Sequence, residues 1–322
     1  MNIKTVFKLA TGLILFSLFF SCSEPVPQRP NILFIMSDDH AYQAISAYSD
    51  ELIQTPNIDR LAKEGAIFTR ATVTNSICAP SRAVLLTGKH SFINGKVDNV
   101  MPFDWDQPNF PKLMQANGYQ TAMIGKIHLD GIPQGFDFSM VLPGQGNYYN
   151  PDFLIEGERV RKEGYVSDII TETTLDWLKN KRDPKKPFCV LYHHKAPHRE
   201  WEPAERHFRE FTQKTFREPA TLFDDYEGRG TAAKTAEMNI LKHQNWAGDS
   251  KLYPEVMNEL GIQETSGWGI NAFNSNTGRM DAEQKAAWDS VFMLRVHRKI
   301  KSDFMKVKLC NSIVDEPRGI LC

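Results

Sequence analysis

A single cysteine stands at the start of a segment that favours a helix. Cys78 precedes Pro80, which suits the first turn of a helix, and good helix formers follow from Ser81 onward. The free N–H groups and partial positive charge at a helix N-terminus stabilise an anion, so this position favours either a cysteine thiolate or a bound oxyanion. The alternative is a buried structural cysteine, which is the ordinary role of a lone cysteine.

Three groups of polar residues each follow an apolar run. Every run has the composition of a strand, and every group contains side chains that bind ions or transfer protons. The groups are Asp38 and Asp39 after 31–36, Lys126 and His128 after 119–124, and His194, Lys195 and His198 after 187–192. Taken one at a time, such residues also suit turns, helix caps or solvated surface positions. Their shared position at strand ends predicts a common site.

Helical segments separate these strands. The segments 56–65 and 108–118 each begin near a proline and end at a glycine, and 166–178 carries apolar residues at helical spacing. Strands that alternate with helices predict an α/β fold with a mostly parallel sheet flanked by helices, in which ligands bind beyond the carboxyl ends of the strands. The run 31–36 is almost entirely apolar, which predicts a strand buried on both faces of the sheet.

The run Cys78-Ala79-Pro80-Ser81-Arg82 resembles the modification signature of the type I sulfatases, which is cysteine, any residue, proline, serine and arginine. Ser-Asp-Asp after the first strand, Gly-Lys-x-His after a middle strand and Lys-Ala-Pro-His after a later one are similar to further sulfatase motifs in the same order. The resemblance extends over Arg29 to Arg279. It implies the alkaline-phosphatase-like fold of that family, hydrolysis of sulfate esters, and oxidation of Cys78 to Cα-formylglycine by a sulfatase-maturating enzyme.

The resemblance implies catalytic roles. In that family the modified cysteine hydrates to a geminal diol that attacks sulfur and afterwards expels sulfate. By resemblance, Arg82 would hold the hydrated aldehyde, Lys126 would clamp the sulfate and His128 would handle the diol proton. His198 would contact the sulfate or protonate the leaving alcohol. These residue types suit the reaction, because negative charge grows on the bridging oxygen as the S–O bond breaks, and cations and a proton donor stabilise it.

The resemblance implies metal ligands as well. Asp38, Asp39 and an oxygen of the modified Cys78 would bind a divalent cation, commonly Ca²⁺, with Mg²⁺ as the alternative. Family members carry a later Ser/Thr-Asp-x-Gly element that completes this site, and the sequence has no such element. Asp98-Asn99-Val100 and Val314-Asp315-Glu316 lack the glycine and the preceding strand. Calcium usually takes roughly six to eight oxygen ligands, so the predicted metal site is incomplete.

The C-terminal part departs from the family. Asp281 begins the capping-box signature of a last regular helix, whereas 291–322 resembles no sulfatase segment. We expect a partial catalytic domain at 31–290, incomplete at its C-terminus, whose missing strands leave an exposed sheet edge and low solubility. The atypical tail favours a chain that stopped early or left its reading frame near Asp289. The alternative is an amphipathic helix with a cationic face within 295–308.

The N-terminus has the features of an export signal. Two lysines precede the apolar run 9–20, which as a helix would be about 18 Å long, whereas a bilayer core is about 30 Å thick. Phe19-Phe20-Ser21-Cys22 is similar to a bacterial lipobox, which makes 1–22 a lipoprotein signal and 23–30 a tether. We expect export to the bacterial periplasm, outer membrane or cell surface, with a lipid at Cys22 as the membrane anchor. The alternative is a conventional cleaved signal.

The overall composition narrows the class of partner. The formal net charge is −1 and 24% of the 322 residues are charged, which is typical of a soluble globular protein. Such a balance gives no overall attraction to nucleic acid, and we expect no nucleic-acid partner. The five cysteines show no zinc or disulfide-framework spacing, and a Cys310–Cys322 bridge stays an open alternative.

The loop 142–151 is rich in glycine and aromatic residues and is similar to a segment of N-acetylglucosamine-6-sulfatases. This likeness implies hydrolysis of sulfate esters on sulfated glycans, with 6-O-sulfated N-acetylglucosamine as the substrate. Tyr148 and Tyr149 would either stack on a sugar ring, with Lys126 and His198 on the sulfate, or pack the loop itself. The alternative functions are an inactive remnant, a glycan-binding lipoprotein, a phosphoesterase of the same superfamily, and a thiol hydrolase that uses unmodified Cys78.

Overall fold

The structure, a computed structural model, describes residues 29–293 apart from 219, 222–223, 238–242 and 264–266. The predicted export signal, the lipidation site Cys22, most of the tether and the tail from 294 onward lie outside the described residues, as do Cys310 and Cys322. None of the described helices has both the length and the apolar character that a membrane span requires.

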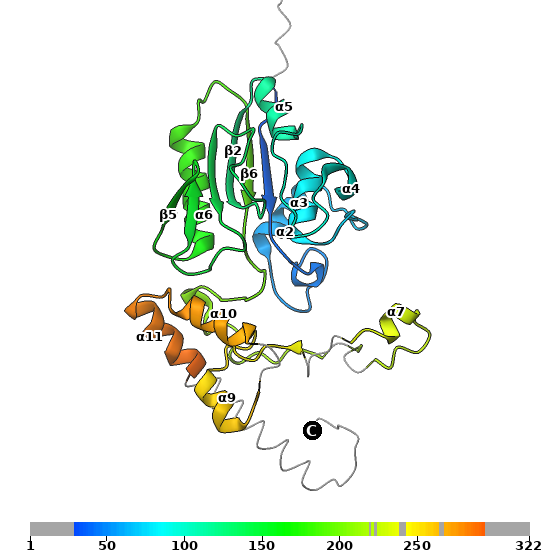
Figure 1. Cartoon of the computed structure of the whole chain (residues 1–322), viewed down its shortest axis with the longest axis vertical. Helices are drawn as coiled ribbons and strands as arrows, with labels where there is room; N and C mark the ends of the chain where they lie inside the picture. Colours follow the sequence, from blue (N-terminus) through cyan, green and yellow to red (C-terminus); the bar gives the residue numbers. More distant parts are fainter. Residues whose placement is uncertain (1–28, 219, 222–223, 238–242, 264–266, 294–322) are drawn as a thin grey trace, which may run out of the picture.

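Six strands of the described chain form one mixed sheet (Figure 1). In spatial order they are β1 (Ile32–Met36), β6 (Phe188–His193), β2 (Gln120–Lys126), β3 (Phe138–Leu142), β4 (Asp152–Ile155) and β5 (Glu158–Arg161). The first four strands are parallel, whereas β4 and β5 are added antiparallel. The three predicted strands are therefore neighbours. Met36 and Gly125 both lie opposite His193, so the carboxyl ends of β1, β6 and β2 meet at one edge of the sheet.

Helices and short helical turns connect and flank the strands. They are η1 (Tyr42–Ala44), α2 (Pro56–Glu64), α3 (Cys78–Thr87), α4 (Ser91–Asn94), α5 (Phe110–Ala116), α6 (Val166–Asp176), η2 (Trp177–Lys181), η3 (Glu205–His207), α7 (Thr231–Lys234), α9 (Pro254–Leu260), α10 (Trp268–Thr277) and α11 (Ala282–Val291). The three helices predicted from proline, glycine and apolar spacing are confirmed as α2, α5 and α6. The helix predicted after Cys78 begins at Cys78 itself, with Ile77 as its N-cap residue.

The predicted capping box is present at the start of α11. The Asp281 carboxylate accepts a hydrogen bond from the Gln284 backbone N–H, and the Gln284 side chain accepts one from the Asp281 N–H. Figure 1 shows α9, α10 and α11 below the sheet, at the end where β1 finishes. These helices therefore lie on the side of the sheet where the predicted polar groups gather.

Alternating residues of β2 divide the core between the two faces of the sheet. Ala122 and Ile124 join a cluster that includes residues of α6, α9, α10 and α11, whereas Met123 joins a cluster with α3. Figure 1 shows α6 on one side of the sheet and α3 and α5 on the other. The sheet is thus covered on both faces around β2 and β6, which fixes the strand ends in place.

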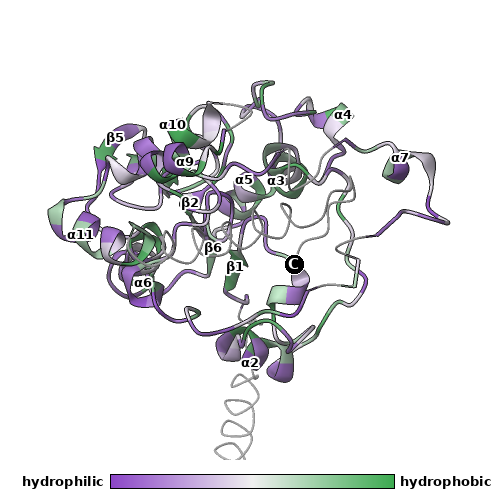
Figure 2. Ribbon diagram, turned by 90° about the horizontal axis from the view of Figure 1, so that it is seen from below, coloured by the Kyte–Doolittle hydropathy of each residue, from purple (hydrophilic) through white to green (hydrophobic). Residues whose placement is uncertain are grey.

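β1 is more exposed than its apolar sequence predicts. Leu33 and Ile35 are 44% and 51% exposed, so the expectation of a strand buried on both faces is wrong. The reason is its position, because β1 is the edge of the sheet and pairs with β6 alone among the described strands. The helix α2 likewise buries none of its residues. Figure 2 shows β1 as hydrophobic and α2 as a mixture of both residue classes. Among the described strands, β1 is therefore an exposed apolar edge.

Gly125 lies where a side chain does not fit. Its φ is +111°, and a Cβ atom would collide with the backbone carbonyl of His193 on β6. We expect Gly125→Ala to lower the free energy of unfolding by about 3 kcal/mol or more, because backbone strain and overpacking add. Urea denaturation followed by circular dichroism measures the loss. Gly88→Ala is the control, since its φ is +66° but its Cβ would meet open space, and it should cost about 1 kcal/mol. Equal losses would contradict the prediction.

Candidate active site

A pocket of about 660 Å³ opens at the carboxyl end of β1. It is lined by β1, the loop after it, the first turns of α3 and the loop after β6. The lining residues are Met36, Ser37, Asp38, Asp39, His40, Ala41, Val73, Ser76, Ile77, Cys78, Ser81, Arg82 and His198. The pocket therefore brings together residues that the sequence predicted in one site although they lie far apart along the chain.

Cys78 is the first residue of α3, so its thiol lies at the helix N-terminus. His128 Nδ1 lies 3.0 Å from Cys78 Sγ, and Asn99 Oδ1 and Gln145 Nε2 lie 3.5 and 3.9 Å from it. Asn99 Oδ1 also accepts a hydrogen bond from the Ala79 N–H (3.1 Å), which satisfies a free donor in the first turn of α3. Cys78 is only half-buried and faces polar groups, so the alternative of a cysteine packed in the core does not hold.

The surroundings of Cys78 favour its anionic form. Partial burial would raise the pKa of the thiol, but hydrogen bonds with His128 and His198 and the charge of Lys126 outweigh the burial and lower the pKa to about 5. An unmodified Cys78 is therefore a thiolate at neutral pH. Because the pocket stabilises negative charge at this position, the same groups suit a bound oxyanion.

A buried ion cluster lies beside Cys78. Lys126, at the end of β2, forms an ion pair with Asp38, and Arg82 Nη2 lies 3.6 Å from the same carboxylate oxygen. Burial would raise the pKa of Asp38, but the two cations lower it below its ordinary value. Burial lowers the pKa of Lys126 to about 8, and Asp38 opposes this shift. With two cations and one carboxylate, the cluster has an excess of positive charge next to Cys78.

Gln145 connects the ion cluster to Cys78. Lys126 Nζ donates to Gln145 Oε1 (2.5 Å), and because an ammonium group can only donate, the amide oxygen must face Lys126. The amide nitrogen then faces the Cys78 thiol as a hydrogen-bond donor. Gln145 and Asn99 were missed by the sequence prediction as site residues, because both come from loops and no spacing distinguishes them from other amides.

Two neighbouring histidines at the end of β6, of which the sequence predicted only His194 in the site, have different places. His193, the last residue of β6, is buried, and its Nδ1 accepts a hydrogen bond from Arg82 Nη1 (3.1 Å). Burial and the charge of Arg82 hold the pKa of His193 well below its usual range, so this imidazole is a neutral acceptor. His194, which the sequence predicted in the site, packs its ring against Tyr192 instead, with 4.5 Å between ring centroids. Successive residues at a strand end point to opposite faces, which explains the difference.

His198 lines the pocket with one ring nitrogen fixed. Its Nδ1 lies 2.5 Å from the Arg199 carbonyl oxygen, which can only accept, so Nδ1 carries a hydrogen. Nε2 is then the nitrogen that remains for a partner in the pocket. The Tyr148 hydroxyl donates to the His198 carbonyl (2.6 Å), and Lys195 Nζ donates to the Arg199 carbonyl (3.3 Å). Lys195 therefore binds the same carbonyl oxygen as His198 and does not line the pocket.

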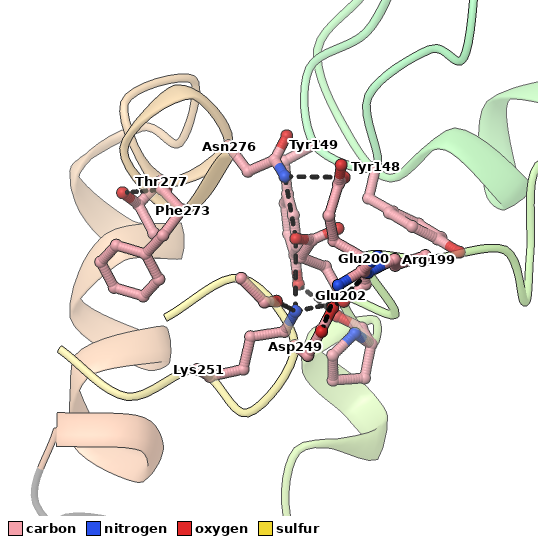
Figure 3. A network of polar contacts seen from close by, with 12 residues as sticks. Tyr148, Tyr149, Arg199, Glu200, Glu202, Asp249, Lys251, Phe273, Asn276 and Thr277 are labelled. Carbon is pink, nitrogen blue, oxygen red and sulfur yellow. Dashed lines mark hydrogen bonds and ion pairs between the residues drawn. The ribbon is translucent and has the colours of Figure 1, made fainter. Parts of the chain in front are cut away.

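Tyr148 and Tyr149 do not face the pocket. Both side chains are buried, and their hydroxyl groups donate to the backbone carbonyls of His198 and Pro203. The Tyr148 ring stacks on Tyr165 with 5.9 Å between centroids. The prediction that these tyrosines stack on a sugar ring is therefore wrong, and they pack the loop instead. Figure 3 shows both tyrosines within a network of buried polar residues.

The predicted metal ligands supply only part of a metal site. Asp38 and Asp39 line the same pocket as Cys78, and carboxylate oxygens are donors that calcium prefers. Asp38 is already paired with Lys126 and Arg82. Within the part of the chain that the structure describes, no three His, Cys, Asp or Glu side chains form a group that could hold a metal ion. Calcium takes roughly six to eight oxygen ligands, so the described residues do not complete the predicted site.

Known proteins are similar to this chain in sequence. Residues 30–258 match the family model described as Sulfatase. The chain is 47% identical over 289 residues to an N-acetylglucosamine-6-O-sulfatase of Bacteroides thetaiotaomicron, a match that covers 88% of this chain and 50% of that protein. It is 34% identical over 177 residues to an ulvan-active sulfatase of Formosa agariphila, a match that covers 55% of this chain and 32% of that protein.

A solved structure, described as a complex with its substrate D-glucosamine-2-N,6-O-disulfate, matches the chain with a TM-score of 0.77 and 47% sequence identity. The match covers 86% of this chain and 55% of that chain. The chain thus spans about half the length of these two 47%-identical relatives. The likeness confirms the predicted fold class.

The reactivity of the unmodified Cys78 thiol reports on the electrostatic environment of the pocket. We expect its rate of alkylation by iodoacetamide to rise with pH through a midpoint near 5, because the thiolate is the reactive form. Cys189, whose pKa burial raises to about 11, is the control within the same chain and should stay unreactive. Replacing His128 by Phe should move the Cys78 midpoint upward. Peptide mass spectrometry measures both cysteines, and a Cys78 midpoint near the ordinary value of 9.0 would contradict the prediction.

Proposed function

The chain belongs to the sulfatase family, and from this we propose that it hydrolyses sulfate esters on sulfated glycans. The observation that carries the proposal is the position of Cys78, which lies at the N-terminus of α3 within reach of His128 and His198 and beside Lys126 and Arg82. The 47% identity to an N-acetylglucosamine-6-O-sulfatase supports 6-O-sulfated N-acetylglucosamine as the proposed substrate.

Sulfatases generally use a formylglycine residue and a divalent metal, and we propose that a sulfatase-maturating enzyme oxidises Cys78 to formylglycine. When hydrated, this residue supplies one hydroxyl group that attacks sulfur and a second whose deprotonation releases sulfate. The position suits it, because an oxygen on the Cβ of residue 78 would face the partners that the thiol faces here, His128 and His198. A plain cysteine nucleophile would lack that second hydroxyl group.

The residues around residue 78 would stabilise charge and move protons. Lys126 and Arg82 balance the negative charge of the sulfate, and the Gln145 amide adds a neutral donor directed at residue 78. His128 Nδ1, 3.0 Å from the side chain of residue 78, accepts the proton of the attacking hydroxyl. His198 donates from Nε2 to the leaving alcohol oxygen, because its Nδ1 is already bound to a backbone carbonyl.

Two further parts of the proposal concern the metal and the location of the protein. We propose that Asp38 and Asp39 contribute oxygen ligands to a divalent cation, Ca²⁺ or alternatively Mg²⁺, and we assign no reaction step to it. We also propose export and a lipid anchor at Cys22, which places the enzyme in the periplasm or on the cell surface. The N-terminal lysines, the short apolar run 9–20 and the lipobox-like Phe19-Phe20-Ser21-Cys22 support this.

Sulfate release tests the proposed activity. The full chain, made together with a maturating enzyme and supplied with Ca²⁺, should release sulfate from 6-O-sulfated N-acetylglucosamine, as measured by ion chromatography. Cys78→Ala should abolish release, whereas Cys189→Ala, which changes a buried thiol on β6, should retain it. Mass spectrometry of the peptide around residue 78 should show loss of sulfur. If sulfur is retained in every molecule and no sulfate appears, the proposal is wrong. Parallel assays on 2-O- and N-sulfated sugars test the sulfate position.

The proton-donor role of His198 has its own test. His198→Ala should slow hydrolysis of a glycan sulfate by about 10² to 10⁴-fold, because a sugar alkoxide is a poor leaving group without a proton. An aryl sulfate releases a stable phenolate and depends less on proton donation, so its rate of hydrolysis should fall by much less. Steady-state measurements of kcat/KM on the two substrates give the difference. Equal losses on both would show that His198 binds sulfate and does not donate the proton.

A further inference from the structure

The peptide that follows His198 is held from several sides. The Arg199 carbonyl accepts hydrogen bonds from His198 Nδ1 (2.5 Å) and Lys195 Nζ (3.3 Å). The Arg199 guanidinium forms two 2.5 Å hydrogen bonds with the Asp249 carboxylate and lies over the Trp268 ring, 4.4 Å from its centroid. The orientation of the His198 imidazole thus depends on where the Arg199 carbonyl is placed.

The next residues carry two carboxylates that converge on α10. Asn276 Nδ2 donates to Glu200 Oε2 (3.0 Å) and to Glu202 Oε1 (2.9 Å), and its Oδ1 accepts from Asn147 Nδ2 (3.0 Å). Since Oδ1 is used as an acceptor, the two hydrogens of Nδ2 are free for the two carboxylates. Figure 3 shows Asn276 and Lys251 meeting this segment.

Burial makes these contacts strong constraints. Glu202 is 3% exposed and Asn276 is 6% exposed. If the hydrogen-bond partner of either residue moved, the free-energy cost would be larger than for a surface residue, because water could not replace the partner. Lys251 Nζ lies 3.5 Å from Glu202 Oε1 and donates to the Glu200 carbonyl. Burial raises the pKa of Glu202, and Lys251 opposes this shift. Asn276 is thus a neutral double donor between two neighbouring acidic side chains.

We infer that Asn276 is a positioning residue for His198. It holds the Glu200 carboxylate, which fixes the Arg199–Glu200 peptide and hence the carbonyl that accepts from His198 Nδ1. Through this path a residue of α10, which does not line the pocket, holds His198 in the wall of the pocket that Cys78 also lines. The activity test of this inference rests on the proposed function, because it follows the proton that His198 donates to the leaving alcohol.

Asn276→Asp tests the inference, and Asn274→Asp on the exposed side of the same helix is the matched control. The substitution at position 276 would bring a third carboxylate and no donor, so Glu200 and the Arg199 carbonyl should move and His198 should lose its position. In the full chain matured as above, kcat/KM on the glycan sulfate should fall by about tenfold or more, whereas kcat/KM on the aryl sulfate, which needs less proton donation, should fall by much less. Asn274→Asp should leave both values unchanged. Circular dichroism verifies that both variants are folded.

The path through His198 is tested by combining variants. In a His198→Ala background, Asn276→Asp should lower kcat/KM on the glycan sulfate no further, because the contact that it disturbs is already absent. Glu200→Ala provides a second variant that cuts the path without adding charge, with the exposed Glu205→Ala as its control. If Asn276→Asp and Glu200→Ala lower the melting temperature but lower kcat/KM on both substrates equally, the network is only structural and the inference is overturned. If the unsubstituted chain releases no sulfate, the proposed function fails, and crystal structures of Asn276→Asp and Asn274→Asp decide the inference: a His198 imidazole that is unmoved in both overturns it.

Discussion

The site depends on an unequal charge balance inside the protein. Arg82 and Lys126 are both buried next to a single buried carboxylate, Asp38. Burying charged groups is costly unless each finds a partner, and one carboxylate cannot fully satisfy two cations. An anion at residue 78 supplies the missing negative charge. Hydrogen bonding to His128 and His198 lowers the pKa of the Cys78 thiol, and the charge of Lys126 adds to this effect. The same excess of positive charge makes the pocket suitable for an oxyanion.

The sheet makes this arrangement possible because its register brings three strand ends into one row. Met36 and Gly125 lie on either side of His193, so the residues that follow β1 and end β2 come close together. Because Gly125 has no side chain, the backbone of β2 can lie close to the His193 carbonyl, with which any Cβ atom at this position would collide. His193 accepts a hydrogen bond from the Arg82 guanidinium. Regular backbone geometry thus positions the cations, while loops supply the groups that contact residue 78.

The sequence predicts the strand ends well and the loop contacts poorly, for physical reasons. Apolar runs followed by polar groups place Asp38 and Lys126 together, because parallel strands end at one edge. No such periodicity exists for Gln145, whose role comes from a hydrogen bond with Lys126. The sequence pattern also does not decide which of two adjacent histidines points toward the site, because adjacent residues of a strand point to opposite faces of the sheet. In the structure it is His193 that contacts the ion cluster, through Arg82.

The aromatic loop and the metal site illustrate two other limits of sequence patterns. Tyr148 and Tyr149 have the composition of a sugar-binding loop, but their hydroxyl groups find backbone acceptors, which allows the rings to be buried. For the metal, Asp38 and Asp39 line one pocket, but Asp38 is already paired with Lys126 and Arg82. A divalent cation beside these two buried cations would add to the excess of positive charge, so the proposed metal site would require further anionic ligands.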